Sequence, residues 1–186
     1  MAGTERAVFK TFIRGSAERV WREITKTDEP QGAIMNLMLH TDGLRPGARV
    51  HLRTPSGKHT GAVGEVLEFE PPRRYTHTFR FTSYDDPPFR VTYDLTEVPD
   101  GVEFRLLLQG LPSGTRTAKE MKRGGTMIAR TLKAIVESGR IPLDTRLLYG
   151  VFRILEPFSP RRTRAEHWPL EGSPPGEGST GPRREG

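Results

Sequence analysis

The sequence contains no cysteine, and this absence excludes several kinds of site. A disulfide framework, a thiolate nucleophile and a zinc site built on cysteine are all ruled out. The chain also lacks any apolar run approaching the roughly 18 residues of a membrane span, and residues 1–6 contain no apolar signal core. We therefore expect a cytoplasmic protein without a membrane segment.

Apolar and aromatic residues are scarce as well, at 34% and 8% of the 186 residues. This length suits one domain with short additions, and the lean apolar share indicates that part of the chain lies outside a packed core. Residues 171–186 are rich in Gly, Pro and Ser, a composition that predicts disorder. Residues 1–4 are expected to form a short N-terminal tail.

Positive charge is in excess, with a formal net charge of +6. Such an excess raises the question of a nucleic acid or another anionic partner. Five arginines, however, fall within the last 26 residues, without the interleaved aromatic platform that single-strand binders use. We interpret them as a solvated basic C-terminus and expect neither a nucleic acid nor a membrane as partner.

A long helix is predicted over residues 117–139. Thr117 and Glu120 have the spacing of a capping box, in which the two side chains satisfy two backbone amides of the helix start. Gly139 favours a left-handed C-terminal residue, and Pro142 lies just beyond. One apolar stripe recurs at helical spacing: Met121, Gly125, Ile128, Leu132 and Ile135/Val136. A helix with such a stripe needs an apolar surface to lie on.

A series of strands supplies that surface. Apolar alternation and turn signals at hairpin spacing predict strands over residues 6–14, 48–53, 61–70, 75–82, 89–97 and 102–109. A short helix begins after Ser16, whereas residues 31–39 fit either a helical turn or a strand. The order predicts an α+β fold in which a curved antiparallel sheet wraps around the long C-terminal helix, with a short helix pair near the N-terminus.

Several stretches together carry a more specific pattern. They read SAERVW at 16–21, LRPGAR at 44–49, GEVLEFEPPR at 64–73, VTYDL at 91–95, DG at 100–101 and GG at 124–125. In this order they resemble the START-like helix-grip superfamily (SRPBCC), and within it the domain related to activators of the heat-shock-protein-ninety ATPase. The resemblance covers about residues 5–139. It implies a helix-grip fold with a cavity between the sheet and the long helix.

Two stretches depart from the pattern of that family. The family commonly has tryptophan after the glycine of the long helix, where this chain has Thr126, and often a Trp-Phe-Gly-like stretch where this chain reads Met35-Asn-Leu-Met. Both changes replace bulk with smaller or more flexible side chains. If these positions line the cavity, its shape is altered here, and the identity of a ligand does not carry over.

An apolar pocket between helix and sheet is the usual form of a small-molecule site. The ligand-binding candidates are the residues that should face each other across it: His77, Phe79, Tyr93, Phe104, Met121, Gly125 and Ile128. The alternative is that these side chains simply fill the core. His77 and Tyr93 could act as acid and base, or they could hydrogen bond to the backbone or to each other.

Neither a metal nor a cofactor is expected. His51 and His59 lack a third ligand nearby in the sequence. The glycines at 61 and 64 are too close together for a dinucleotide-binding loop, and residues 110–114 lack the spacing of a nucleophile elbow.

Residues 140–170 form an addition to the domain of residues 5–139. Apolar residues at helical spacing predict an amphipathic helix within 141–158: Leu143, Leu147, Val151, Ile154/Leu155 and Phe158. Three coverings are open for its apolar face: the domain itself, a second copy in a homodimer, or an anionic membrane surface.

Three functions are compatible with these observations. We favour the binding of a small apolar or amphipathic molecule in the cavity. The first alternative is a protein-interaction module resembling the chaperone-ATPase activators, and the second is an enzyme of polyketide-cyclase or dehydratase type. No residue set in the sequence demands catalysis.

Overall fold

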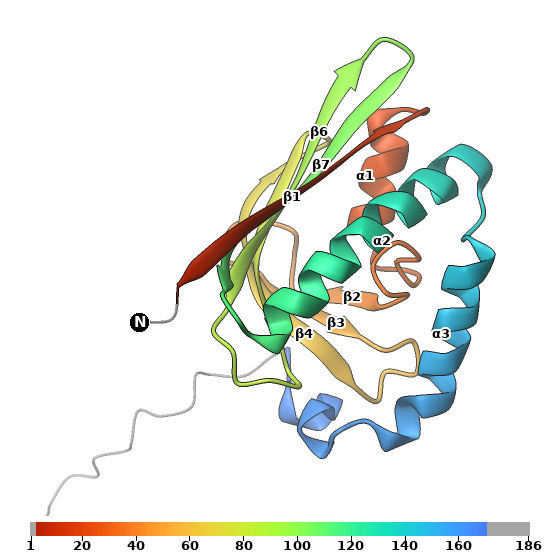
Figure 1. Cartoon of the computed structure of the whole chain (residues 1–186). Coiled ribbons are helices and arrows are strands. Elements are labelled where there is room, and N and C mark those ends of the chain that lie inside the picture. Colours follow the sequence, from red (N-terminus) through yellow and green to blue (C-terminus); the bar gives the residue numbers. More distant parts are fainter. Residues whose placement is uncertain (1–2, 171–186) are drawn as a thin grey trace, which may run out of the picture.

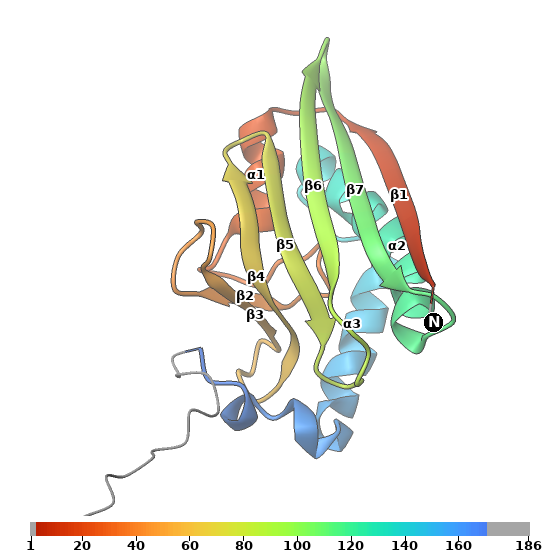
Figure 2. The same cartoon turned by 90° about the vertical axis from the view of Figure 1, so that its left-hand side faces the viewer.

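The computed structural model describes residues 3–170, and within this range seven antiparallel strands form one sheet. The strands are β1 (Thr4–Ile13), β2 (Met38–Thr41), β3 (Arg49–Arg53), β4 (Thr60–Glu70), β5 (Arg74–Phe81), β6 (Phe89–Val98) and β7 (Gly101–Pro112). Their order across the sheet is β1-β7-β6-β5-β4-β3-β2. Figure 2 shows the sheet from the side opposite the long helix, with β1 at one edge. Strands β2 to β7 thus form an antiparallel meander, in which β3 to β7 correspond to predicted strands, and β1 joins it beside β7.

The sheet curves, and local irregularities in the strands explain how. The pairing register shifts at Glu5/Arg6, at Leu52/Arg53 and again between Val66 and Glu68, as expected of bulges that bend a strand. At Gly64, an added Cβ would lie 1.8 Å from the carbonyl oxygen of Thr78 on the neighbouring strand. Only glycine permits so close an approach of two backbones.

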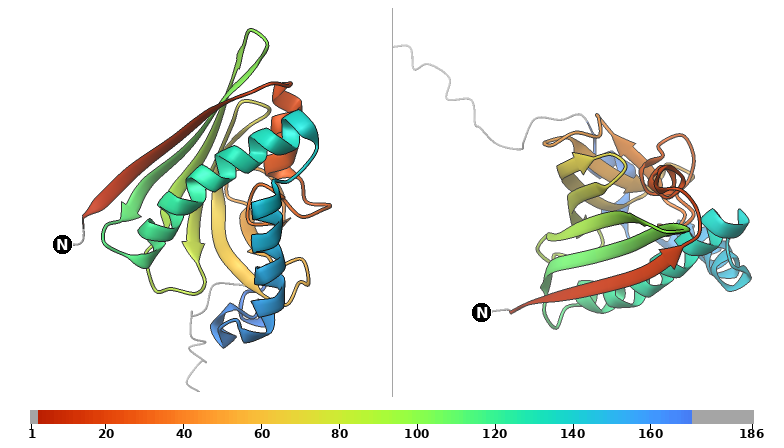
Figure 3. Two further views of the ribbon diagram at one scale, coloured as in Figure 1. Left: turned by 45° about the vertical axis from the view of Figure 1, so that its right-hand side comes forward. Right: turned by 90° about the horizontal axis from the view of Figure 1, so that it is seen from above.

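The long helix α2 (Arg116–Ser138) lies across the concave face of this sheet (Figure 1). Its buried side chains include Met121, Ile128 and Leu132. The inward residues of β7 oppose the helix and are fully buried: Val102, Phe104, Leu106 and Leu108. The predicted α+β helix-grip fold is therefore confirmed, and Figure 3 shows the sheet wrapping around the helix.

The start of α2 differs from the prediction. The N-cap is Thr115, whose hydroxyl accepts from the Ala118 amide at 3.2 Å. Thr117 lies inside the helix, and its amide donates to Asp86 at 3.3 Å. The capping box at Thr117 was therefore wrong, because a contact with the β5–β6 loop occupies the amide and lets the helix begin earlier. The predicted end is confirmed, since Gly139 has φ 68° and its N–H bonds the Ile135 carbonyl at 2.8 Å.

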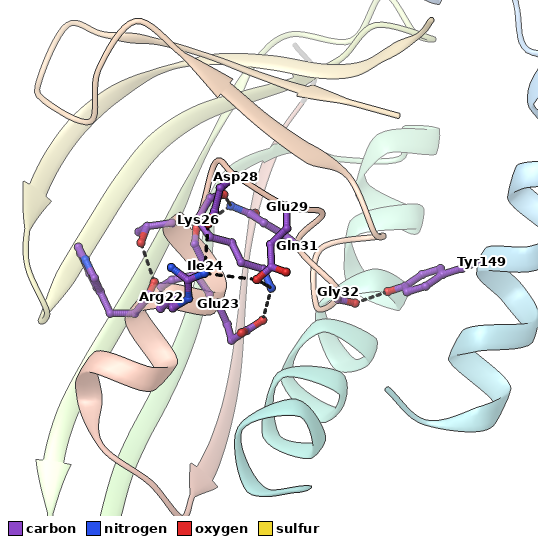
Figure 4. A network of polar contacts seen from close by, with 11 residues as sticks. Arg22, Glu23, Ile24, Lys26, Asp28, Glu29, Gln31, Gly32 and Tyr149 are labelled. Carbon is purple, nitrogen blue, oxygen red and sulfur yellow. Dashed lines mark hydrogen bonds and ion pairs between the residues drawn. The ribbon is translucent and has the colours of Figure 1, made fainter. Parts of the chain in front are cut away.

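One short helix, not a pair, follows β1. The helix is α1 (Ala17–Thr25), capped by Ser16 as predicted. In place of a second helix, residues 32–36 form turns that lead into β2. The Gln31 side-chain amide holds this segment against the end of α1 by donating to the carbonyls of Ile24 (3.2 Å) and Lys26 (3.0 Å) (Figure 4). These hydrogen bonds favour a compact loop over a second helix.

The predicted amphipathic helix is present as α3 (Leu143–Leu155). It contacts the domain through Thr145 and Tyr149, and the Tyr149 hydroxyl donates to the Gly32 carbonyl at 2.8 Å (Figure 4). Three 3-10 turns continue the chain: Glu156–Phe158, Arg161–Thr163 and Ala165–His167.

The described range of residues 3–170 includes part of the predicted N-terminal tail but none of the predicted C-terminal tail. Strand β1 begins at Thr4, so this residue belongs to the sheet and not to the expected tail of residues 1–4. The expected disorder of residues 171–186 falls outside the described residues. No helix between residues 3 and 170 is long and apolar enough to cross a membrane.

Candidate functional site

A cavity of about 270 Å³ lies between α2 and the sheet. Its wall combines residues of β3 to β7, of α2, of the loop after β5 and of the turn before β2. Apolar residues form most of it: Ile34, Met35, Leu37, Leu52, Ala62, Phe79, Phe81, Val91, Tyr93, Leu106, Met121 and Ile128, with Gly61 and Gly124. An enclosed apolar surface of this kind suits a small apolar molecule.

One part of the wall is polar. It is formed by Ser83, Tyr84 and Glu120. The Tyr84 hydroxyl donates to the Glu120 carboxylate at 2.7 Å and so joins the β5–β6 loop to α2. Burial, together with the neighbouring carboxylate, raises the pKa of Tyr84 to about 12. The Arg116 guanidinium lies 5.3 Å from the centre of the Tyr84 ring and 3.5 Å from Glu120. This group offers hydrogen-bond partners to a polar substituent of a ligand.

The turn before β2 forms another part of the wall, and its backbone is strained. Met35 and Asn36 both have φ 55°, a left-handed conformation that is costly for residues other than glycine. Met35 and Leu37 line the cavity and also a second, more open groove of about 650 Å³ beside α3. This turn therefore separates the inner cavity from the outer groove. Of the two departures from the family pattern, the one at Met35 lies at the cavity, whereas Thr126 is exposed on α2.

The structure brings together four of the seven candidate residues. Phe79, Tyr93, Met121 and Ile128 lie in the cavity wall, although a role in ligand binding stays a prediction for each. Phe104 is fully buried, with its ring 6.3 Å from that of Tyr93, and is not among the described wall residues.

Gly125 faces β1 instead of the cavity. An added Cβ at this position would lie 2.2 Å from the ring of Phe9. Its neighbour Gly124 lines the cavity, because one residue along a helix turns the side-chain direction by about 100°.

His77 is also outside the set of described residues that line the cavity. Its ring stacks against Tyr75 at 5.0 Å and Tyr93 at 6.0 Å, and its Nδ1 lies 2.7 Å from the Thr78 carbonyl, to which it can only donate. Burial lowers the pKa of His77 to about 4 and raises that of Tyr93. The sequence left two roles open for His77, acid–base chemistry or a hydrogen bond to the backbone. A neutral imidazole that donates to a backbone carbonyl matches the second role.

The histidines considered for metal binding lie in separate surroundings. The His59 ring nitrogen contacts the Thr163 hydroxyl at 2.9 Å, and His51 is buried in β3, opposite His40 of β2. No cluster of three potential metal ligands occurs in the described part of the chain.

With this geometry established, comparison with known proteins gives the family. Residues 6–137 match the family described as "Activator of Hsp90 ATPase homolog 1-like protein". The chain belongs to this family. The match spans the helix-grip domain and stops just before the end of α2, so α3 and the segment that follows lie beyond it. None of the curated proteins compared with the chain matches it.

Solved structures share the fold of this Activator of Hsp90 ATPase homolog 1-like domain. The Aha1 dimer from Colwellia psychrerythraea is 14% identical, with a TM-score of 0.58, over 73% of this chain and 98% of that one. PFC0360w, an HSP90 activator from Plasmodium falciparum, is 15% identical, with a TM-score of 0.58, over 72% and 96%. CalU16 from Micromonospora echinospora is 21% identical, with a TM-score of 0.57, over 80% and 92%. At these identities the likeness concerns the fold alone.

Sequence reasoning missed the polar part of the site. Tyr84 lies in a loop where no periodicity marks an inward direction, and Glu120 fitted a capping box with Thr117. The position of Glu120 next to Met121, and one turn before Gly124, was a usable signal that it lies near the same helix face. Phe81, Val91 and Leu106 belong to the alternating inward faces that the strand pattern already indicated.

Proposed function

We propose that this domain binds a small, mainly apolar molecule that carries one polar group, in the cavity between α2 and the sheet. The supporting observation is the cavity itself, with its apolar wall and a single polar cluster. Protein interiors are close-packed, and unfilled apolar space costs stability. A void of about 270 Å³ therefore needs an explanation, and a ligand supplies one.

The cavity limits the size and the chemistry of the ligand. Its volume lies slightly below the roughly 300 to 1,000 Å³ of common ligand pockets, so the molecule is small. The Glu120 carboxylate, which already accepts from Tyr84, has further acceptor capacity. A ligand hydroxyl or amine that donates to Glu120 therefore fits better than a carboxylate.

The decisive experiment fills the cavity from the helix. Nothing lies within 4 Å of a Cβ added at Gly124, so Gly124→Leu should fold and occupy the ligand's space. The probes are 1-octanol and 1-naphthol, two small apolar alcohols, tested by thermal shift and by NMR titration. A probe at about 100 times its Kd should add about 2.7 kcal/mol of stability to the wild type, and little to Gly124→Leu.

Thr126→Leu is the matched control, because Thr126 is exposed on the same helix. It should respond to the probes as the wild type does. If Gly124→Leu binds them equally well, or if no small apolar alcohol binds the wild type, the proposal is wrong.

An interaction module that activates a chaperone ATPase is the second candidate. It is supported by the description of the family and by the Plasmodium falciparum HSP90 activator among the similar structures. Stimulation of Hsp90 ATPase activity that is equal for wild type and Gly124→Leu would favour this candidate over ligand binding. The cyclase or dehydratase hypothesis stays a prediction. Of its acid–base pair, Tyr93 lies in the cavity wall, whereas His77 is not among the described wall residues.

A further inference from the structure

The outer face of α3 exposes a row of large apolar side chains. The row, here called the α3 stripe, consists of Leu143, Leu147, Val151 and Ile154 of α3 together with Phe158 of the 3-10 turn that follows directly, and no described part of the domain covers it. Leu147 is 72% exposed and Phe158 83%. Thr145 and Tyr149 occupy the opposite face and hold the helix to the domain. Contiguous apolar surface of this kind marks an interaction site in a folded protein.

We propose that the α3 stripe binds the α3 stripe of a second copy, with the two helices antiparallel. The spacing of the stripe carries this inference, because it is symmetric about the midpoint between Gly150 and Val151. In the antiparallel pair, Leu143 faces Phe158 of the second copy and Leu147 faces its Ile154. A two-fold axis at the midpoint therefore matches Leu143 with Phe158 and Leu147 with Ile154, and it leaves Val151 opposite Gly150.

The centre of the stripe permits close contact between the helices. Gly150 is exposed, with nothing within 4 Å of the place where a Cβ would stand. Under the two-fold operation Val151 of each copy meets Gly150 of the other. A valine opposite a glycine fills the space that two larger residues would compete for.

The area of the patch suits a dimer. Phe152 and Leu155 are also exposed, but they line the groove beside α3 and lie outside the stripe. At roughly 100 Å² for each large side chain, the five residues of the stripe offer about 500 Å² per copy. Two copies would bury about 1,000 Å² in total, the lower limit of a specific interface.

The charges beside the stripe predict how salt changes the affinity of the dimer. Arg146 and Arg153, one heptad apart, lie on the same flank of α3, and among residues 3–170 neither has an ion-pair partner. The two-fold axis brings this flank of both copies to one edge, where the four arginines repel each other. Because salt screens such exposed charges, the dimer should become tighter as salt rises. An anionic membrane surface would attract the same arginines, so its binding would become weaker.

The first experiment is disulfide cross-linking. Because the native sequence has no cysteine, only the introduced thiols can form a disulfide. Val151→Cys places a thiol beside the proposed axis. Val8→Cys is the matched control, since Val8 is a valine of similar exposure on β1, 42% against 49%. Under mild oxidation Val151→Cys should form a covalent dimer much faster than Val8→Cys. Leu147→Cys should cross-link to Ile154→Cys in a mixture, and more slowly to itself.

The second experiment is sedimentation velocity of the full chain over a range of concentrations and salt. Leu147→Glu should raise the dimer Kd by more than about tenfold, and circular dichroism should remain native because this side chain is exposed. Arg153→Glu should tighten the dimer, because it replaces a repulsive charge with one that attracts Arg146 of the second copy. These tests do not depend on a cavity ligand, since the stripe lies on the outer face of α3.

Three results would overturn the proposal. They are a wild type that stays monomeric at all concentrations, equal cross-linking of Val151→Cys and Val8→Cys, and an association that weakens with salt. Binding of the monomer to vesicles of equimolar phosphatidylcholine and phosphatidylglycerol, lost in Leu147→Glu, would assign the stripe to a membrane surface instead.

Discussion

His77 lies among aromatic rings on the inner face of β5, where its environment favours the neutral form. Tyr75, Tyr93 and Phe79 surround it at ring distances of 5.0, 6.0 and 6.3 Å. The one hydrogen bond, to the Thr78 carbonyl, does not offset the loss of hydration, so burial lowers the pKa of His77 to about 4. The residue that looked most reactive in the sequence is thereby a structural member of the core.

This burial predicts a pH dependence of stability. The pKa of an unperturbed histidine is about 6.5, so the unfolded chain binds the proton more readily than the native one. The contribution of His77 is fully present above about pH 6.5 and is lost as the pH falls toward 4. The loss amounts to at most about 3 kcal/mol.

The measurement is guanidinium unfolding of wild type and His77→Phe between pH 7 and 4. The free energy of unfolding of wild type should fall more steeply, and the difference between the two curves isolates His77 from the carboxylates. Parallel curves would show that His77 can be protonated in the native state without cost.

At the scale of the element, α2 contains two adjacent glycines with opposite surroundings. Gly125 allows the helix to approach β1, where an added Cβ would meet the Phe9 ring at 2.2 Å. Gly124 faces the cavity, and a Cβ there would meet nothing within 4 Å. Glycine in a helix interior costs about 1 kcal/mol relative to alanine, so the two positions should respond to the same substitution with opposite signs.

We therefore expect Gly124→Ala to stabilise the protein by about 0.5 to 1 kcal/mol. Gly125→Ala should destabilise it by about 1 to 2 kcal/mol, because overpacking against a ring held between strand and helix exceeds the gain in helix propensity. Chemical denaturation of the two variants measures both values. A stabilising Gly125→Ala would mean that β1 moves away from α2 at little cost.

At the scale of the whole molecule, the chain divides into a helix-grip domain and a C-terminal addition that follows its surface. The family match ends at residue 137, near the end of α2. The addition is held by polar contacts, among them the Tyr149 hydrogen bond to Gly32 and the bond from the Arg53 guanidinium to the Trp168 carbonyl at 3.0 Å. Its most apolar surface, the α3 stripe, faces outward.

A chain that ends at Arg140 should therefore fold. We expect native near-ultraviolet circular dichroism and one cooperative unfolding transition, with a stability about 2 to 4 kcal/mol below that of the full chain, the sum of a few net hydrogen bonds and some lost burial. A truncated chain without a cooperative transition would show instead that α3 completes the core.

The sequence by itself determined the elements and the fold, because these depend on local periodicity. The alternation in β5, β6 and β7 and the stripe of Met121, Ile128 and Leu132 persist over many residues, so small errors of register cancel. The end of α2 at Gly139 was predictable for the same reason, since the left-handed cap is a property of one residue. The pattern also placed Phe79 and Tyr93 on the inner face of the sheet.

Only the tertiary structure decided the details of the site, because each depends on a contact between distant segments. Phe9 decides that Gly125 faces β1 and leaves Gly124 at the cavity, and Tyr84 takes Glu120 away from the helix cap. Gln31 anchors a turn where a second helix was expected. A helix rotates by about 100° per residue, so the pattern of α2 could place a face but not a single side chain, and a polar contact across 36 residues has no periodic signal in the chain.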